Sequence, residues 1–281
     1  MTDDSANRPP FPPSESKRRL ARTYADSGWE GVREYDAAMR WHAAHPQQGS
    51  YVASRALDLP RGRLRAWFDG AKPEAVRAID TAESRGWLDA VPGDPTFEGL
   101  SVLHAWILAG GSIAQDTFVP SLAVGPADPG GLARDAFAAT GIRSRRVNES
   151  TAERATEIRP DGPGRSHLGR FLHGVLGAPV GDKTRIGAEP LAYLASVPKM
   201  TLLRWCQTYV TLRGSAVELA QGGRTVRLGE RRSREYRRAL ADRFRAVVGD
   251  DAHVTVTDYA TVLGADTLGM LDVAPALPSD D

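Results

Sequence analysis

The chain has 281 residues, 41% of them hydrophobic and 25% charged, and its net charge is only +1. These values are typical of a globular protein with one large or two modest domains. No apolar run approaches the roughly 20 residues that span a bilayer, and the N-terminus has no apolar signal core. The single cysteine, Cys206, excludes an intrachain disulfide, so we expect a cytoplasmic protein with no membrane partner.

The first third of the sequence predicts a tail, a helical domain and a linker. Residues 1–13 are rich in Pro and Ser and predict a disordered tail. Residues 14–91 alternate helical patterns with turn signals, which predicts an all-helical domain. The Pro-Gly-Asp-Pro sequence within residues 92–96 breaks the chain and predicts a linker.

Two short helices joined by a tight turn stand out inside the helical domain. Ser50 is expected to cap the first helix, whose apolar side would carry Val52, Ala53, Ala56 and Leu57. A turn at residues 58–60 leads into a second helix at residues 61–68. This spacing is typical of a helix-turn-helix.

In that interpretation the second helix recognises DNA. It carries Arg61, Arg63 and Arg65 before an anchoring Trp67. The planar guanidinium group donates two hydrogen bonds at once, which suits both phosphates and guanine edges. We therefore predict DNA contacts from these three arginines and from Ser50. The alternative is a plain helical bundle with a solvated arginine face.

The remainder of the chain predicts an internal duplication. Two apolar helices, FEGLSVLHAWILAGGSI at residues 97–113 and LLRWCQTYVTLRGSAV at residues 202–217, each end at glycine and continue into an extended segment. Strand-like and helical segments follow each helix in similar order, including an amphipathic helix after residue 230 with Tyr236, Leu240, Phe244 and Val247 on one face. The expected halves are residues 97–186 and 187–272, followed by an acidic tail at 273–281.

These two helices resemble a known family. LHAWILAGGSI and TYVTLRGS are similar to the two LAGLIDADG helices of homing endonucleases. The resemblance implies that the helices pack side by side at a pseudo-twofold axis, and that the strands form a saddle in the DNA major groove. The expected fold class is therefore α+β, with an N-terminal all-helical helix-turn-helix domain followed by a pseudo-twofold duplicated αββαββα LAGLIDADG-like domain.

The acidic residues of the family's motif are missing from both copies. The position before the final glycine is Gly110 in the first copy and Arg213 in the second, and the other common acidic position holds Leu108 and Thr211. Cleavage with divalent metals needs anionic oxygen ligands. The resemblance thus implies a DNA-binding surface without nuclease activity, metal or cofactor. Asp116 is the nearest acid that could replace the lost carboxylates.

Charge is distributed unevenly along the second domain. Residues 134–245 contain 22 Lys and Arg against 11 Asp and Glu, whereas the chain from residue 250 onward has seven acids and no base. Such asymmetry favours a basic surface for a polyanion. The candidate DNA-binding arginines on strands are Arg143, Arg145, Arg159, Arg224 and Arg227, with Arg146 on the face opposite to Arg143 and Arg145. The alternative is an ordinary solvated strand face.

Other chemistry is sparse. The histidines show no tight ligand spacing, and His104, inside the first apolar helix, is expected to be a core or interface residue. Cys206 is expected to be a small buried apolar side chain.

Together the parts predict a sequence-specific protein that binds double-stranded DNA and regulates transcription. The combination is similar to the WhiA-type regulators, which carry the same two parts in the opposite order. One alternative is a homing endonuclease that uses displaced acids such as Asp116, and another is a scaffold that binds a protein or small ligand. Two motif copies in one chain mean that a monomer suffices to form the pseudo-twofold.

Overall fold

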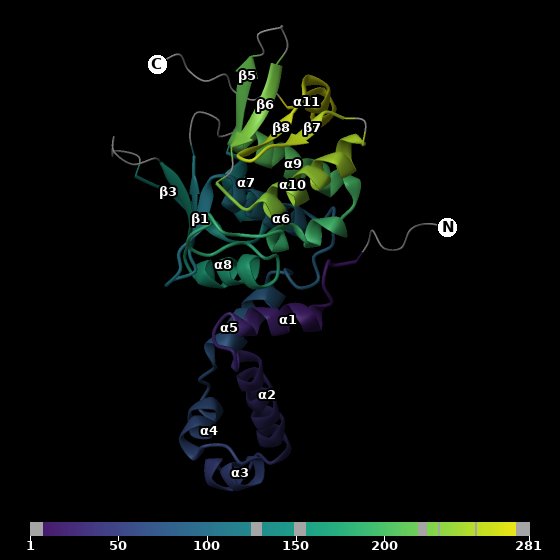
Figure 1. The fold of residues 1–281 in the computed structure, drawn as a ribbon. Coiled ribbons are helices and arrows are strands. Elements are labelled where there is room, and N and C mark those ends of the chain that lie inside the picture. Colours follow the sequence, from purple (N-terminus) through teal and green to yellow (C-terminus); the bar gives the residue numbers. More distant parts are fainter. Residues whose placement is uncertain are drawn as a thin grey trace.

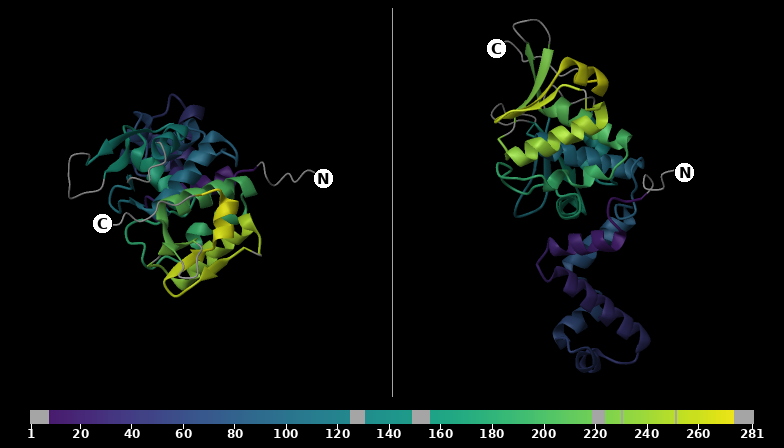
Figure 2. Two further views of the ribbon diagram at one scale, coloured as in Figure 1. Left: turned by 90° about the horizontal axis from the view of Figure 1, so that it is seen from above. Right: turned by 45° about the vertical axis from the view of Figure 1, so that its right-hand side comes forward.

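The computed structural model describes residues 8–124, 131–148, 156–218, 224–229, 231–250 and 252–273. The chain combines helices with two antiparallel four-stranded sheets, which confirms the predicted α+β class. Helices α2 to α4 project from the rest of the molecule as an arm, and the sheets lie in the body (Figure 1). Figure 2 shows the same elongated arrangement from a second side. Within the described residues, no helix is both long and apolar enough to cross a membrane.

The N-terminal region is helical, as predicted. Its helices are α1 (Pro13–Arg22), α2 (Gly28–Ala44), α3 (Ser50–Leu57), α4 (Arg61–Phe68) and α5 (Glu74–Ser84). The predicted bounds of the second short helix, now α4, are confirmed, and the first, α3, ends at Leu57, directly before the predicted turn. The turn between them passes through Asp58, whose backbone is left-handed with φ 54°. The Ser54 hydroxyl donates a hydrogen bond of 2.6 Å to the Leu59 carbonyl, which holds this turn closed.

Two details of α3 differ from the sequence-based expectation. Gly49, not Ser50, occupies the N-cap position, and no side chain caps the helix. Only Ala53 is fully buried, while Val52 is 45% exposed and Ala56 is also exposed. The reason is the position of α3 at the far end of the arm, where it packs against α2 and α4 on one narrow side. Part of the expected apolar side of α3 is therefore exposed to solvent.

The remaining chain repeats one order of elements twice. The first half contains α6 (Pro95–Ala109), β1 (Gly111–Ile113), β2 (Pro120–Ala123), α7 (Leu132–Ala139), β3 (Arg143–Val147), β4 (Glu157–Asp161) and α8 (Arg165–Gly174). The second contains α9 (Lys199–Arg213), β5 (Gly214–Glu218), β6 (Arg224–Gly229), α10 (Arg234–Val248), β7 (Val254–Val256), β8 (Ala260–Leu263) and α11 (Ala265–Leu271). Short 3-10 helices, η2 (Glu189–Leu191) and η3 (Tyr193–Ala195), join the halves.

The two sheets also share a strand order, β1-β2-β4-β3 in the first half and β5-β6-β8-β7 in the second. In each sheet alternate residues face inward, such as the buried Leu122 and Ile158 in the first and Val226 and Leu263 in the second. Strand β8 follows β7 after a tight turn, in which the Thr257 N–H donates to the Ala260 carbonyl at 2.8 Å.

Helices α6 and α9 lie against each other in the centre of the body. The Trp205 indole N–H donates to His104 Nδ1 at 3.1 Å, and the Thr201 hydroxyl donates to Glu98 at 2.7 Å. On the other side of α6, Gly99 lets α7 approach so closely that an added Cβ would lie 2.8 Å from the Ala136 carbonyl oxygen. Small size at this position is therefore a packing requirement.

The helical region and the body are in direct contact through α1, α5, α7 and α8. The Arg170 guanidinium of α8 donates to the Thr23 carbonyl after α1, and it lies 4.0 Å from the ring centre of Tyr24. The Trp87 indole donates to the Thr140 carbonyl at 2.9 Å. Helix α6 begins at Pro95, inside the predicted linker. The part that stands apart from the body is accordingly α2 to α4.

Both predicted tails lie largely outside the described residues, which begin at 8 and end at 273. Within the expected N-terminal tail, Phe11 packs under the Arg19 guanidinium at 3.9 Å and helps line an apolar hollow with Trp87 and Phe171. Helix α1 then begins at Pro13. Residues 8–12 thus have defined packing in the structure.

Candidate nucleic-acid interface

Helix α4 is held in place by two side chains that point into the arm. Leu64 is completely buried, and Trp67 packs edge-on against Tyr35 with ring centres 5.4 Å apart. With 3.6 residues per turn, this anchoring leaves Arg61 and Arg65, four residues apart, on one outward face. Both arginines are exposed.

Arg65 and Ser50 both lie at the outer end of the arm. They line one hollow of about 320 Å³ together with His42, Gln47 and Gln48. The Arg65 side chain is 77% exposed, and its only close acid among the described residues is Asp69, at 3.8 Å. Ser50 therefore belongs to a polar surface rather than to a helix cap.

Arg61 lies beside the other exposed groups of α3. Its guanidinium is 5.8 Å from the ring centre of Tyr51, a side chain that is 59% exposed. Tyr51, Val52 and Arg61 thus form a mixed aromatic, apolar and cationic surface next to the Ser50–Arg65 hollow. Tyr51 was not among the predicted site residues, although an exposed aromatic in the first helix could have been suspected once Ala53 was taken as the buried position.

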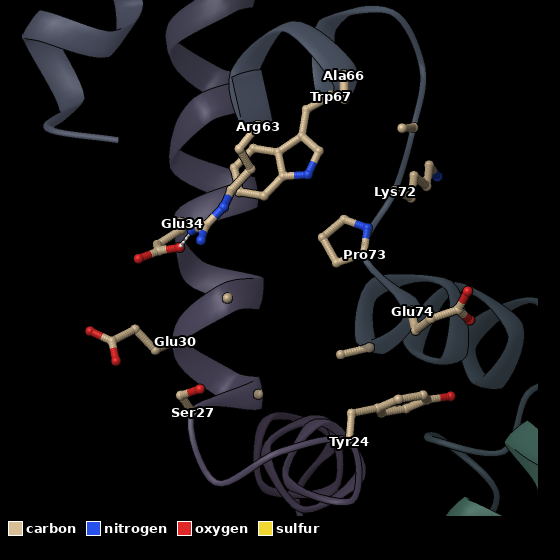
Figure 3. Close-up of a pocket in the computed structure, with 14 residues that line it drawn as sticks. Tyr24, Ser27, Glu30, Glu34, Arg63, Ala66, Trp67, Lys72, Pro73 and Glu74 are labelled. Carbon is tan, nitrogen blue, oxygen red and sulfur yellow. Dashed lines mark hydrogen bonds and ion pairs between the residues drawn. The ribbon is translucent and has the colours of Figure 1, made fainter. Parts of the chain in front are cut away.

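Arg63 points away from Arg61 and Arg65. Its Nη1 donates to Glu34 Oε2 at 2.6 Å, inside a pocket of about 580 Å³ that Glu30 and Glu74 also line (Figure 3). Residues two apart on a helix face different directions, so Arg63 could not share a face with its neighbours. The structure therefore brings together two of the three predicted α4 arginines and turns the third towards acids of the arm.

In the first sheet, Arg145 of β3 pairs directly with Arg159 of β4, and both lie on one face. Acids accompany them on this face. Arg159 is 2.6 Å from Glu157, and Arg145 is 3.8 Å from Asp161, the residue that pairs with Arg143 in the register. Because the acids offset part of the arginine charge, this face is less basic than the sequence indicated. Arg146, on the other face of the edge strand β3, is also exposed.

In the second sheet, Arg227 of β6 pairs with Ser215 of β5 and is exposed. Arg224 pairs through its backbone with Glu218, but its side chain lies outside the described residues. Arg213, at the last turn of α9, donates to the Gly229 carbonyl at the end of β6. Arg213 and Arg227 also line one pocket at this end of the sheet.

Cations occupy the carboxyl end of α6. The Lys183 ammonium donates to the Ile107 carbonyl at 2.7 Å and also to the Gly111 carbonyl, and the Arg232 guanidinium donates to the Leu108 carbonyl. The last carbonyls of a helix lack partners within the helix and carry partial negative charge, so both contacts are stabilising. Sequence reasoning missed Lys183 and Arg232, since each lies more than seventy residues from its acceptor.

The predicted positions around the helix ends hold no carboxylate cluster. Asp116 is exposed in the turn between β1 and β2. In the part of the chain that the structure describes, no three His, Cys, Asp or Glu side chains gather as metal ligands would. His104 is fully buried at the contact with α9, as expected, and burial lowers its pKa to about 3. Burial likewise raises the pKa of the Cys206 thiol, which matches the predicted apolar role.

No protein-family model matches this chain, and no curated protein matches its sequence.

Proposed function

We propose that the chain is a sequence-specific protein that binds double-stranded DNA without cleaving it and regulates transcription, with α4 as its recognition helix. The observation that carries this proposal is the outward face of α4, where Arg61 and Arg65 project from a helix anchored by Leu64 and Trp67. Arginine is the residue that most often reads guanine through paired hydrogen bonds in the major groove.

The local charges of α4 favour an anionic partner. Arg61 is the first residue of the helix, where the helix dipole already concentrates positive charge. A cation at this end costs roughly 0.3–1 kcal/mol, and a bound phosphate would offset that cost. Nearby, Ser50, Gln47 and Gln48 supply hydroxyl and amide groups that can contact phosphates or base edges.

The sheets supply a second surface in this proposal. The LAGLIDADG resemblance implies that strand arginines lie along DNA, and the candidates are Arg143, Arg145, Arg159, Arg224 and Arg227. Two halves with the same strand order, built around the paired helices α6 and α9, support that arrangement. The arm and the β5–β6 hairpin lie at opposite ends of the molecule (Figure 1, Figure 2). The arm would thus read one site while the sheets hold a different stretch.

The first test is binding of the full chain to genomic DNA fragments at two salt concentrations with Mg²⁺ present. We expect a shifted, uncut band on a discrete set of fragments. Its affinity should fall with salt at a log-log slope of roughly −0.9 for each phosphate neutralised. Cut product would instead establish the endonuclease alternative, and absence of binding would leave the scaffold alternative.

The second test separates α4 from general surface charge. Arg61→Ala and Arg65→Ala are each expected to weaken specific binding by about 1–3 kcal/mol. Arg77→Ala is the matched control, because Arg77 is also an exposed helical arginine and lies on α5. Arg63→Ala should cost less than either, since Arg63 is committed to Glu34. Equal losses for Arg61→Ala and Arg77→Ala would show that α4 is not the recognition helix.

A further inference from the structure

An arginine-lined pocket of about 600 Å³ lies at one end of the second sheet, and none of its lining residues belongs to the arm. Its lining comes from the end of α9, the end of β6, the start of α10 and the turn between β7 and β8. The residues are Arg213, Arg227, Gly229, Arg231, Arg232, Arg237, Asp258 and Tyr259. Asp258 is the one acid in this lining. Glu230 lies between Gly229 and Arg231 in the sequence but outside the described structure. With Asp258 and Glu230 both counted, the five arginines leave a net charge of +3.

Two of these arginines are fixed in position by the fold. Arg232 is only 9% exposed and Arg237 only 6%. Arg232 donates to the Tyr209 hydroxyl at 3.2 Å and to the Leu108 carbonyl, and its guanidinium lies 4.5 Å from the ring centre of Tyr236. Arg237 donates to the Thr257 carbonyl at 3.2 Å and to the Arg232 carbonyl. Cations held in this way lose little conformational freedom when a ligand binds, which favours affinity.

The other charged and aromatic lining groups are exposed, and they suit a ligand that has an anionic part and an aromatic part. Arg213, Arg227 and Arg231 are exposed at the pocket rim. Tyr259, at the turn between β7 and β8, is 74% exposed. Guanidinium groups bind phosphate oxygens through paired, charge-assisted hydrogen bonds, and an exposed tyrosine ring offers a stacking surface for a base. Asp258 can accept hydrogen bonds from sugar hydroxyls.

We propose that this pocket binds a phosphorylated nucleoside, with the phosphate on the arginines and the base against Tyr259. The phosphate can belong to a free nucleotide or to a nucleic-acid strand, since the chemistry at the arginines is the same. The site does not use α4, so its ligand can be tested independently of DNA reading by the arm.

The experiment uses calorimetry and thermal melting of the full chain with adenosine 5′-monophosphate, adenosine and inorganic pyrophosphate. The monophosphate should bind and raise the melting temperature, and adenosine should bind at least about tenfold more weakly, because it lacks the charged group. Pyrophosphate should also bind. Equal binding of adenosine and its monophosphate, or binding of none of the three probes and no strand, would overturn the proposal.

Matched variants locate the ligand. Arg227→Gln with Arg231→Gln should weaken binding of both phosphate probes about tenfold or more, while Arg238→Gln, an exposed arginine of α10 outside the pocket, should change neither. Tyr259→Ala should weaken the monophosphate but not pyrophosphate, and Tyr259→Phe should restore it. If the paired glutamine variant binds both phosphate probes normally, the pocket is not their site.

A final competition experiment distinguishes the two possible sources of the phosphate. A short random-sequence duplex or single strand that displaces the monophosphate, and that binds less well to the Arg227→Gln, Arg231→Gln variant, assigns the phosphate to nucleic acid. Monophosphate binding that persists at saturating strand concentrations assigns it to a free nucleotide. In either case Arg61→Ala should leave monophosphate binding unchanged, so failure of the DNA-reading function of α4 remains distinguishable from failure of this site.

Discussion

The two halves of the body share a path but not a charge pattern. Each half runs helix, two strands, helix, two strands, helix, and each sheet has the same strand order. In the first sheet the arginines Arg145 and Arg159 lie close to Asp161 and Glu157. In the second half, five arginines surround one pocket that has Asp258 as the only acid among its described lining residues.

This difference separates the residues that the fold constrains from those that can vary without changing it. The buried inward positions are mostly apolar in both halves, as with Leu122 in the first and Val226 in the second, and Thr261 of β8 is a buried polar exception. Their burial removes apolar surface from water and so stabilises the sheet against its helices. Outward positions contribute little to that burial, and they can therefore differ in charge without changing the path of the chain. Outward positions are therefore where the two halves can come to carry different charges.

The largest expected effect comes from breaking the contact that joins the halves. Trp205 of α9 is fully buried, stacks on Tyr209 with ring centres 5.1 Å apart, and donates to His104 of α6. Trp205→Ala should lower the free energy of unfolding by about 3–5 kcal/mol, because it leaves a cavity and an unpaired buried nitrogen. Urea denaturation followed by circular dichroism measures this.

Trp29→Ala is the control for that prediction. Trp29 is a partly buried tryptophan of the arm helix α2, so the same substitution there should cost clearly less. If the two variants lose similar stability, the α6–α9 contact is not the main joint of the body.

Much of the body was predictable from short-range pattern. Apolar helices that end at glycine located α6 and α9, and the spacing of Tyr236, Leu240, Phe244 and Val247 correctly predicted the buried face of α10. The helical repeat also explains why Arg63 lies on a different face from Arg61 and Arg65. Grouping the three arginines by residue type overlooked this difference.

Other features depend on contacts between distant parts of the chain. Lys183 and Arg232 cap α6 from loops in the second part of the sequence, and nothing near either residue marks that role. The arginine pocket draws on residues from 213 to 259, which come together only when the second sheet forms. The acids beside Arg145 and Arg159 follow from strand register, which the sequence pattern did not specify.

The contact between the halves should also give an acid-sensitive stability. Burial of His104 lowers its pKa to about 3 in the folded protein, well below the roughly 6.5 of an unfolded chain. Between these two pKa values, His104 binds a proton in the unfolded state but not in the folded state. The contribution of His104 to the free energy of unfolding is therefore fully present above about pH 6.5. It declines as the pH falls towards 3, by at most about 1.4 kcal/mol for each pH unit.

Comparison of the wild type with His104→Asn isolates that contribution. The stability difference between the two proteins, measured by urea denaturation from pH 7 to pH 4, should shrink as pH falls. A difference that stays constant over this range would mean that His104 is protonated in the folded state.

The smallest expected effect tests whether the acids of the first sheet are what distinguishes it from the second half. Glu157→Gln with Asp161→Asn removes the negative charges that lie 2.6 Å from Arg159 and 3.8 Å from Arg145. Unfolding free energy should change little, because exposed ion pairs contribute about 0–1 kcal/mol each. If this face contacts DNA, affinity should rise several-fold and the salt slope should steepen by roughly 0.9 for each phosphate newly engaged.

The matched control is Asp242→Asn, which removes the acid 3.0 Å from Arg245 on α10 and which is neither on β3 or β4 nor among the residues that line the arginine pocket. A gain of DNA affinity shared by this control would reflect net charge alone. No gain in the Glu157→Gln, Asp161→Asn variant would mean that the first sheet does not contact DNA. Under that result the proposed DNA contacts would be restricted to α4 and the second half.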